Sequence, residues 1–141
     1  MDRGVYALIL RVTGMTVRVG ALGDITIPKG YLIYVGSALG PGGLIRVQRH
    51  LSTSNDRRKP HWHIDYLLQD RGTSIISSVS AATKSRLECS LAEAIGGACI
   101  PKFGSSDCRC RSHLFLRPDD PTDEVAAAFS SCGLIAAITR Y

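Results

Sequence analysis

Short apolar runs separated by glycine-rich turns fill the first quarter of the chain. Residues 4–12 are rich in Val, Ile, Leu and Tyr, and residues 16–19 and 24–27 alternate polar with apolar side chains. Such runs are typical of short strands, and the glycines at 14 and 20–23 are typical of the tight turns between them. Residues 31–35 make a further apolar run after Pro28-Lys29-Gly30. The pattern predicts strands that open the chain as an antiparallel meander.

Helical spacing appears after the glycine-rich turn at residues 40–43. Apolar positions within 44–51 predict a helix on which Arg46 and Arg49, three residues apart, share one face. A basic loop at 52–59 precedes a helix expected at 61–68, with Pro60 in its first turn. Further helices are predicted at 83–95, with Glu88 in the middle, and at 119–129. Strands are predicted at 73–80, 112–117 and 134–139.

These elements predict an α/β domain of the α+β kind, with a small, mostly antiparallel central sheet flanked by helices. A length of 141 residues is the usual size of one domain. We find no internal repeat and no internal domain boundary in the pattern. A single domain spanning residues 1–141 is therefore expected.

The charge balance favours an anionic partner. The chain has 17 Lys and Arg against 12 Asp and Glu, a net charge of +5. Such an excess suits nucleic acid or an anionic membrane surface, although many basic proteins bind neither. Arg11 interrupts the first apolar stretch, unlike in a signal peptide, and no run approaches the roughly 20 apolar residues of a membrane-spanning helix. We expect a cytoplasmic protein with no membrane partner.

The five cysteines are an odd number for a disulfide framework. Cys108 and Cys110 are too close in sequence for an unstrained bridge with each other, so we expect reduced thiols and no disulfide. Cys89 and Cys132 are expected as small buried residues on helices. A zinc site is an alternative use of the thiols, although the spacing differs from the usual knuckle of paired ligands. Its candidate ligands are Cys99, Cys108, Cys110 and His113.

Two tyrosine motifs, Gly4-Val5-Tyr6 and Tyr34-Val35-Gly36, lie on predicted strands. A strand tyrosine is usually a packing residue, so each motif alone is weak evidence of a site. The second motif continues as Tyr-Val-Gly-Ser-Ala, then Arg46-Val47-Gln48-Arg49-His50-Leu51, and much later Glu88-Cys89-Ser90. Over residues 4–93 this order resembles the GIY-YIG nuclease family, and within it the phage-type homing endonucleases.

The resemblance implies a divalent-metal-dependent endonuclease that hydrolyses phosphodiester bonds of nucleic acid, with DNA as the expected substrate and Mg²⁺ or Mn²⁺ as cofactor. Carried over position by position, it assigns catalytic roles to Tyr6, Tyr34, Arg46, His50 and Glu88. Glu88 is the implied metal ligand, and one carboxylate with water can hold a hard cation. Arg46 suits phosphate because its guanidinium can donate two parallel hydrogen bonds.

The general base stays open among three histidines, His50, His61 and His63. An imidazole titrates near neutral pH and suits proton abstraction from water. The resemblance implies an active-site His or Tyr in the region of His61 and His63, and of these two His61 is slightly preferred. Only one of His61 and His63 can face the site, since helix residues two apart point in opposite directions. Alternatively, Trp62 anchors the helix in the core while both histidines are solvated.

A basic rim beside the catalytic face is the predicted contact with the nucleic-acid backbone; its members are Arg49, Arg57, Arg58 and Lys59. Such contacts give affinity with little sequence preference, so a protein partner is a candidate source of specificity. A solvated charged loop is the alternative for these residues. The rival function is a non-catalytic nucleic-acid-binding module with the same fold. A zinc- or thiol-based redox protein is a weaker third hypothesis.

Overall fold

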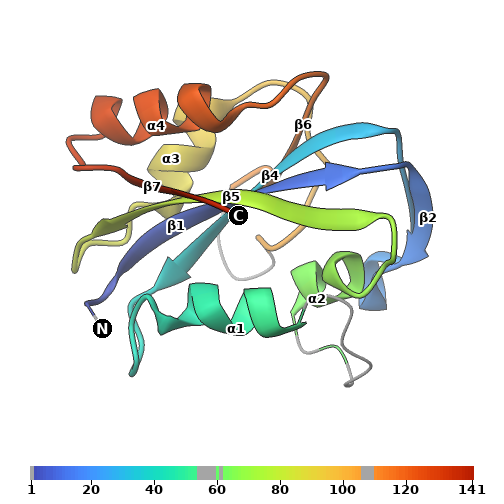
Figure 1. Ribbon diagram of the computed structural model, residues 1–141, viewed down its shortest axis with the longest axis horizontal. Helices are drawn as coiled ribbons and strands as arrows, with labels where there is room; N and C mark the ends of the chain where they lie inside the picture. The colour runs from blue at the N-terminus through green and yellow to red at the C-terminus, as the bar shows by residue number, and fades with distance from the viewer. Residues whose placement is uncertain (1, 54–59, 61, 106–109) are drawn as a thin grey trace.

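The computed structural model describes residues 2–53, 60, 62–105 and 110–141. Within these ranges it contains a five-stranded antiparallel sheet, a two-stranded sheet and four α-helices (Figure 1). The strands are β1 Gly4–Val12, β2 Met15–Arg18, β3 Asp24–Ile27, β4 Gly30–Ala38, β5 Thr73–Ala82, β6 Leu114–Arg117 and β7 Ala137–Arg140. The helices are α1 Ile45–Thr53, α2 His63–Leu68, α3 Glu88–Ile95 and α4 Thr122–Ser131, with a short 3₁₀ turn η1 at Gly20–Leu22. The predicted α+β class is confirmed.

The five-stranded sheet has the order β6-β4-β1-β5-β7, with every neighbouring pair antiparallel. The predicted opening meander is wrong, because β2 and β3 pair with each other in a separate sheet. The burial of the strands explains the difference. β1 is buried on both faces along most of its length, as a central strand must be, whereas β2 and β3 are largely half-exposed. β1 therefore pairs with β4 and β5, the other long strands.

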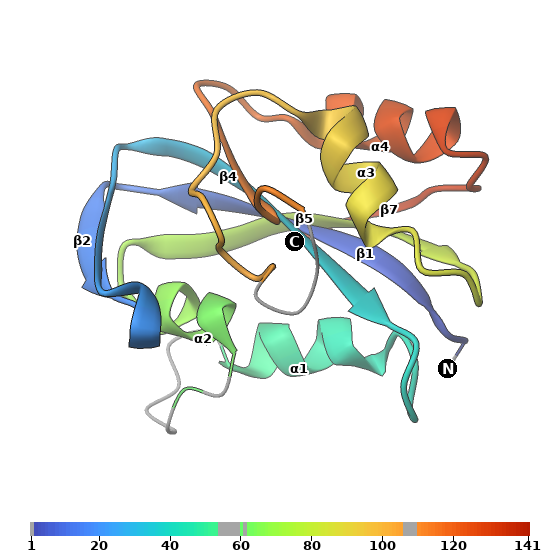
Figure 2. The same ribbon diagram turned by 180° about the vertical axis from the view of Figure 1, so that it is seen from behind.

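Helices cover both faces of the central sheet, α1 and α2 on one side and α3 and α4 on the other (Figures 1 and 2). Side chains alternate between these layers along β1, as the strand period of two requires. Tyr6, Leu8 and Leu10 lie in the core on the α1 and α2 side. Val5, Ala7 and Ile9 lie in the core under α3 and α4. None of the helices in the described ranges is long and apolar enough to cross a membrane.

The predicted helix at 83–95 is shorter than expected, and its first residue is Glu88, so the mid-helix position predicted for Glu88 is wrong. The Thr83 backbone N–H donates to the Arg3 carbonyl at 3.0 Å, which continues the pairing of β5 with β1. The Thr83 hydroxyl then accepts from the Ser85 N–H at 3.1 Å, a local turn that competes with helix. The helix consequently starts five residues later, and Glu88 stands at its amino terminus.

Candidate active site

The two motif tyrosines lie on neighbouring strands and on the same face of the sheet. In the β1 and β4 pairing, Tyr6 stands opposite Gly36 and Leu8 stands opposite Tyr34. The Tyr6 ring lies over Gly36 so closely that a Cβ at Gly36 would overlap its Cζ and Oη atoms. Both tyrosines are buried, Tyr6 to 1% exposure and Tyr34 to 8%. The motif glycine is therefore the residue that makes room for the Tyr6 ring.

Gly36→Ala should destabilise the protein by about 1–3 kcal/mol, the usual cost of adding a methyl group to a filled core. The clash is with a ring that is itself enclosed, so the ring cannot move aside without disturbing α1. Gly40→Ala is the matched control, because a Cβ there meets no atom within 4 Å. Urea unfolding of both variants measures the difference, and equal stabilities would contradict the proposed fit of Tyr6 over Gly36.

His50 on α1 meets the Tyr6 hydroxyl below the sheet. The Tyr6 Oη and His50 Nε2 atoms are 2.7 Å apart, and both residues are 1% exposed. Burial lowers the pKa of His50 to about 4, so its ring is neutral at pH 7. Burial raises the pKa of Tyr6 well above 10, with the Tyr34 hydroxyl acting in the same direction and Arg46 opposing them. At neutral pH Tyr6 keeps its proton and can donate it to the neutral imidazole.

Two further aromatic rings, those of Tyr34 and Trp62, pack against His50. Its ring centroid lies 6.1 Å from that of Tyr34 and 5.7 Å from that of Trp62, both at steep angles. Tyr34 also packs edge-on against Phe103, with 6.3 Å between the ring centroids. The His50 Nδ1 atom is buried and has no hydrogen-bond partner within the described part of the chain. A buried polar atom without a partner is uncommon and marks this histidine as a candidate functional group.

The pH dependence of stability should report the burial of His50. Its pKa is about 4 in the folded protein against 6.5 when unfolded, so between these values the unfolded chain binds more protons. Stability is therefore lost as pH falls from 6.5 to 4, by an amount on the order of 3 kcal/mol. Unfolding of the wild type and of His50→Gln across this range isolates the effect. Parallel curves for the two proteins would show that His50 does not cause it.

Arg46 lies at the edge of the sheet where β6 ends. β6 pairs with β4 at residues 31–34, and the Val35 N–H still donates to the His113 carbonyl at 2.9 Å. Because strand residues two apart present their backbone groups in the same direction, the Ser37 carbonyl points toward the edge that β6 leaves uncovered. Arg46 Nη1 donates to that carbonyl at 2.6 Å. The guanidinium thus stands at an open sheet edge, half-buried.

Trp62 is a partner of Arg46 that the sequence did not reveal. The Arg46 guanidinium carbon lies 5.2 Å from the centre of the Trp62 ring, a cation–π distance. Sequence reasoning gave Trp62 only an anchoring role between two histidines. Tyr6, Tyr34, His50, Arg46 and Trp62 together form a cluster, called here the tyrosine–arginine cluster. α1, α2, β1 and β4 meet in it.

Glu88 approaches from the other layer. α3 packs against α4 and β4, and its first residue, Glu88, has a buried Oε2 atom without a hydrogen-bond partner among the described residues. No hydrogen bond or ion pair among the described residues joins Glu88 to the tyrosine–arginine cluster. The link is indirect, since Cys89 lies beside His113, whose carbonyl accepts from Val35. The start of α3 is thus held at the same edge of β4 as Arg46.

The remaining predicted site residues are divided between the described and the undescribed parts of the chain. Arg49 is exposed on α1, whereas Arg57, Arg58, Lys59 and His61 fall outside the described residues. The other open histidine, His63, accepts a hydrogen bond from the Gly104 N–H at 2.9 Å through Nδ1 and packs against Phe103. Burial lowers its pKa. Of His50 and His63, the two candidates that the structure describes, His50 is the one hydrogen-bonded to Tyr6.

The expectation of no disulfide is wrong, because the structure contains a Cys89–Cys110 disulfide. An odd number of cysteines permits one bridge when the others stay unpaired, and Cys99 and Cys132 are free. Tertiary packing, which sequence spacing does not show, brings the start of α3 to the segment before β6. Cys89 therefore pairs rather than acting as a simple packing residue.

The predicted zinc ligand set also needs correction. Cys99 forms an isolated backbone bridge with Phe115 and is not part of any metal-ligating group found in the described ranges. Cys108 falls outside those ranges. His113 instead lies with Cys89 and Cys110. Cys89 directly follows Glu88 in the sequence. This adjacency is the sequence signal that links the group of Cys89, Cys110 and His113 to the candidate site.

The fold and the tyrosine–arginine cluster together define a small α+β domain with a buried Tyr–His pair and an arginine at a sheet edge. The chain belongs to the family described as Domain of unknown function DUF123, whose family model matches residues 5–134. No curated protein and no solved structure matches the chain. The matched range includes every described residue of the cluster and Glu88.

Proposed function

We propose that the protein is a cytoplasmic, divalent-metal-dependent endonuclease of the GIY-YIG type that hydrolyses phosphodiester bonds in DNA. One observation carries the proposal. Tyr6, Tyr34, Arg46 and His50, four of the five residues to which the resemblance assigns catalytic roles, share one cluster although they lie up to 44 positions apart in the sequence. Arg46 in that cluster is partly exposed at a sheet edge, where a phosphate group can approach.

Arg46 is the group that meets the phosphate in this proposal. A guanidinium has five N–H donors, so the bond to Ser37 leaves others for phosphoryl oxygens. The Trp62 ring and the Ser37 carbonyl hold the guanidinium at the sheet edge, and a preorganised cation stabilises the charge that develops in the transition state. Arg49, exposed on the same helix, adds a contact with the phosphate backbone of the nucleic acid, and such a contact carries no sequence information. A protein partner would then supply the choice of substrate site.

Tyr6 and His50 provide the route for a proton. As the attacking water loses a proton to the Tyr6 oxygen, the Tyr6 proton moves along the 2.7 Å hydrogen bond to His50 Nε2. His50 is neutral at pH 7 because its pKa is lowered to about 4, so its Nε2 lone pair can accept this proton, although the lowered pKa also makes it a weaker base than an exposed imidazole. Tyr34, whose ring packs against His50, orients the water or the phosphate. The hydroxyls of Tyr6 and Tyr34 therefore act together with His50.

Glu88 fits a hard cation by the chemistry of its donor atom. Its buried Oε2 has no hydrogen-bond partner in the part of the chain that the structure describes, and Mg²⁺ and Mn²⁺ prefer carboxylate oxygen with water in the other positions. When bound, such a cation lowers the pKa of water and neutralises charge on the phosphate. Glu88 at the start of α3 also lies where the helix dipole stabilises its carboxylate.

The direct test mixes the purified full chain with labelled branched, flapped, nicked and single-stranded DNA and with RNA, each with Mg²⁺ or Mn²⁺. We expect strand cleavage of a DNA substrate that stops when EDTA is added. A matched Arg46→Ala preparation controls for contaminating nucleases. Absence of cleavage on every substrate, with a correctly folded protein, would reject the enzymatic function.

The burial of Tyr6 and His50 favours a second candidate, a nucleic-acid-binding module that does not cleave. Each residue is only 1% exposed, as expected for groups that hold α1 against the sheet rather than for groups that touch a substrate. In that case Arg46 and Arg49 bind the phosphate backbone and Glu88 is dispensable. DNA binding that is lost with raised salt, without metal-dependent cleavage, would select this function.

A further inference from the structure

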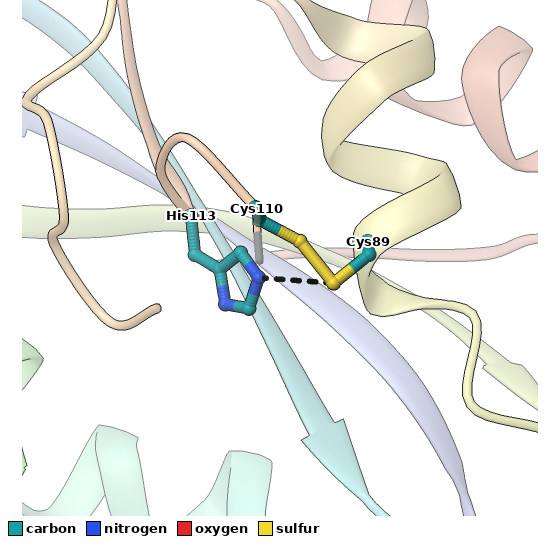
Figure 3. Close-up of side chains that lie close together, drawn as sticks. All are labelled: Cys89, Cys110 and His113. Atoms are coloured by element: carbon teal, nitrogen blue, oxygen red, sulfur yellow. Dashed lines mark hydrogen bonds between the residues drawn. A yellow bond between two sulfur atoms is a disulfide. The ribbon is translucent and has the colours of Figure 1, made fainter. Parts of the chain in front are cut away.

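Three metal-ligating side chains gather beside the start of α3 (Figure 3). The sulfur atoms of Cys89 and Cys110 and a ring nitrogen of His113 lie within 4.8 Å of one another. His113 Nε2 is 4.0 Å from Cys89 Sγ and points toward the disulfide. His113 is buried and both cysteines are partly buried. The proposed nuclease function uses none of these three residues.

We propose that in the reduced protein Cys89, Cys110 and His113 bind one zinc ion. Zinc in proteins takes a tetrahedral shell of thiolate and imidazole ligands, with bonds of about 2.3 Å to sulfur and 2.0–2.1 Å to nitrogen. Those bonds place the ligand sulfurs about 3.8 Å apart and a sulfur and a nitrogen about 3.6 Å apart. The observed 4.0 Å between His113 Nε2 and Cys89 Sγ is close to this value.

The backbone already stands at the right separation. The Cα atoms of Cys89 and Cys110 are 5.7 Å apart, so rotation of the two side chains alone can open the sulfurs to the distance that zinc needs. Two thiolates and an imidazole are softer ligands than the oxygen donors that Mg²⁺ prefers, and they select zinc over the hard cation assigned to Glu88. The fourth tetrahedral position is left for water, since the group within the described residues consists of these three side chains.

Formation of the site begins with reduction of the disulfide. A small dithiol reductant transfers two electrons and two protons, which breaks the Cys89–Cys110 bond and leaves two thiols, while the reductant becomes a cyclic disulfide. Zn²⁺ then displaces one proton from each thiol, and neutral His113 donates its Nε2 lone pair. The disulfide and the zinc site are thus alternative states of the same pair of cysteines.

Solvent can reach the sulfurs through a surface pocket of about 480 Å³ between α3 and the segment before β6. Cys89 and Cys110 are in its wall, together with Gly97, Cys99, Arg111 and Phe115. A metal ion and a small reductant therefore have a path to the site. In either state the cross-link holds Glu88, the neighbour of Cys89, at the edge of β4.

Zinc analysis of the full chain tests the proposal. Protein purified with a dithiol reductant under anaerobic conditions should contain about one zinc per chain by elemental analysis. Cys89→Ser, Cys110→Ser and His113→Asn should each reduce bound zinc at least tenfold at equal free zinc. Cys99→Ser and Cys132→Ser are the matched controls, since these cysteines lie outside the group, and they should retain zinc as the wild type does.

Cobalt substitution in the wild type avoids dependence on variants that fold poorly. Reduced protein with Co²⁺ should show a thiolate-to-cobalt charge-transfer band and the visible absorption of tetrahedral cobalt, and both should disappear after oxidation to the disulfide. A reduced wild type without zinc and without these bands overturns the proposal. So does zinc content that is equally retained in all five variants. The readout does not depend on cleavage, so its failure is distinct from failure of the nuclease function.

Discussion

Glu88→Gln should lower metal-dependent cleavage about a thousandfold while leaving DNA binding intact or slightly tighter. Glutamine keeps the size and shape of the side chain but removes the charge that holds a hard cation. The loss corresponds to several kcal/mol of transition-state stabilisation, the usual contribution of a catalytic metal. Removing a negative charge from a basic surface also reduces its repulsion of phosphate. Cleavage rates and Kd values measured at one salt concentration separate the two effects.

Glu93→Gln is the matched control for this experiment. It makes the same substitution on the same helix, at an exposed residue, and should leave both cleavage and binding unchanged. The comparison is made across a titration of Mg²⁺ and Mn²⁺, because a weakened site can be filled at high metal concentration. Wild-type cleavage by Glu88→Gln throughout that titration would show that Glu88 is not the metal ligand.

The sequence predicted those elements whose apolar pattern is strong and local. The bounds of β1 and β3 agree with the expected ranges, because Gly14 and Pro28 lie just beyond their ends and glycine and proline interrupt strands. The positions of β5, α1 and α4 are right to within a few residues. The end of β4 was predicted too early, since Gly36 reads as a strand terminator. In the structure Gly36 lies within the strand, where its missing side chain accommodates Tyr6.

The pairing of strands could not be derived from their local pattern. The strands expected at 16–19 and 24–27 were placed in the opening meander, but β2 and β3 pair with each other outside the central sheet. Pairing depends on which strands are long and buried on both faces, and that is settled by the helices that cover them. The Cys89–Cys110 disulfide is likewise a product of tertiary packing between residues 21 apart. Whether the number of cysteines is odd or even does not indicate which of them lie close together in the fold.

The candidate site was predicted in its composition and not in its arrangement. Tyr6, Tyr34, Arg46 and His50 could be singled out because they occur in a recognisable order along the chain. Their burial could not be predicted, because the burial of Tyr6 and His50 depends on how α1 packs against the sheet. The bond from Arg46 to Ser37 depends on where β6 ends, which is a feature of the sheet edge rather than of the Arg46 segment.

Arg46→Ala should weaken DNA binding and should also lower the cleavage rate of bound substrate about a thousandfold. The guanidinium is proposed to contact the phosphate both before and during the reaction, so its loss affects both steps. Removing one preorganised donor to the transition state typically costs about 10²- to 10³-fold, and loss of the positive charge adds to this. Single-turnover cleavage at saturating protein separates the rate from the affinity.

Two companion variants distinguish this role from simple support of the sheet edge. Arg46→Lys keeps the charge but lacks the planar fork that binds phosphate through two hydrogen bonds, so binding should recover more than the cleavage rate. Arg49→Ala removes an exposed charge of the same helix and should weaken binding, with a smaller salt dependence, without changing the rate of bound substrate. A structural role for Arg46 predicts instead that unfolding free energy falls in both Arg46 variants while cleavage per folded molecule stays constant. That result would remove Arg46 from the catalytic groups, because its bond to Ser37 would then account for its whole contribution.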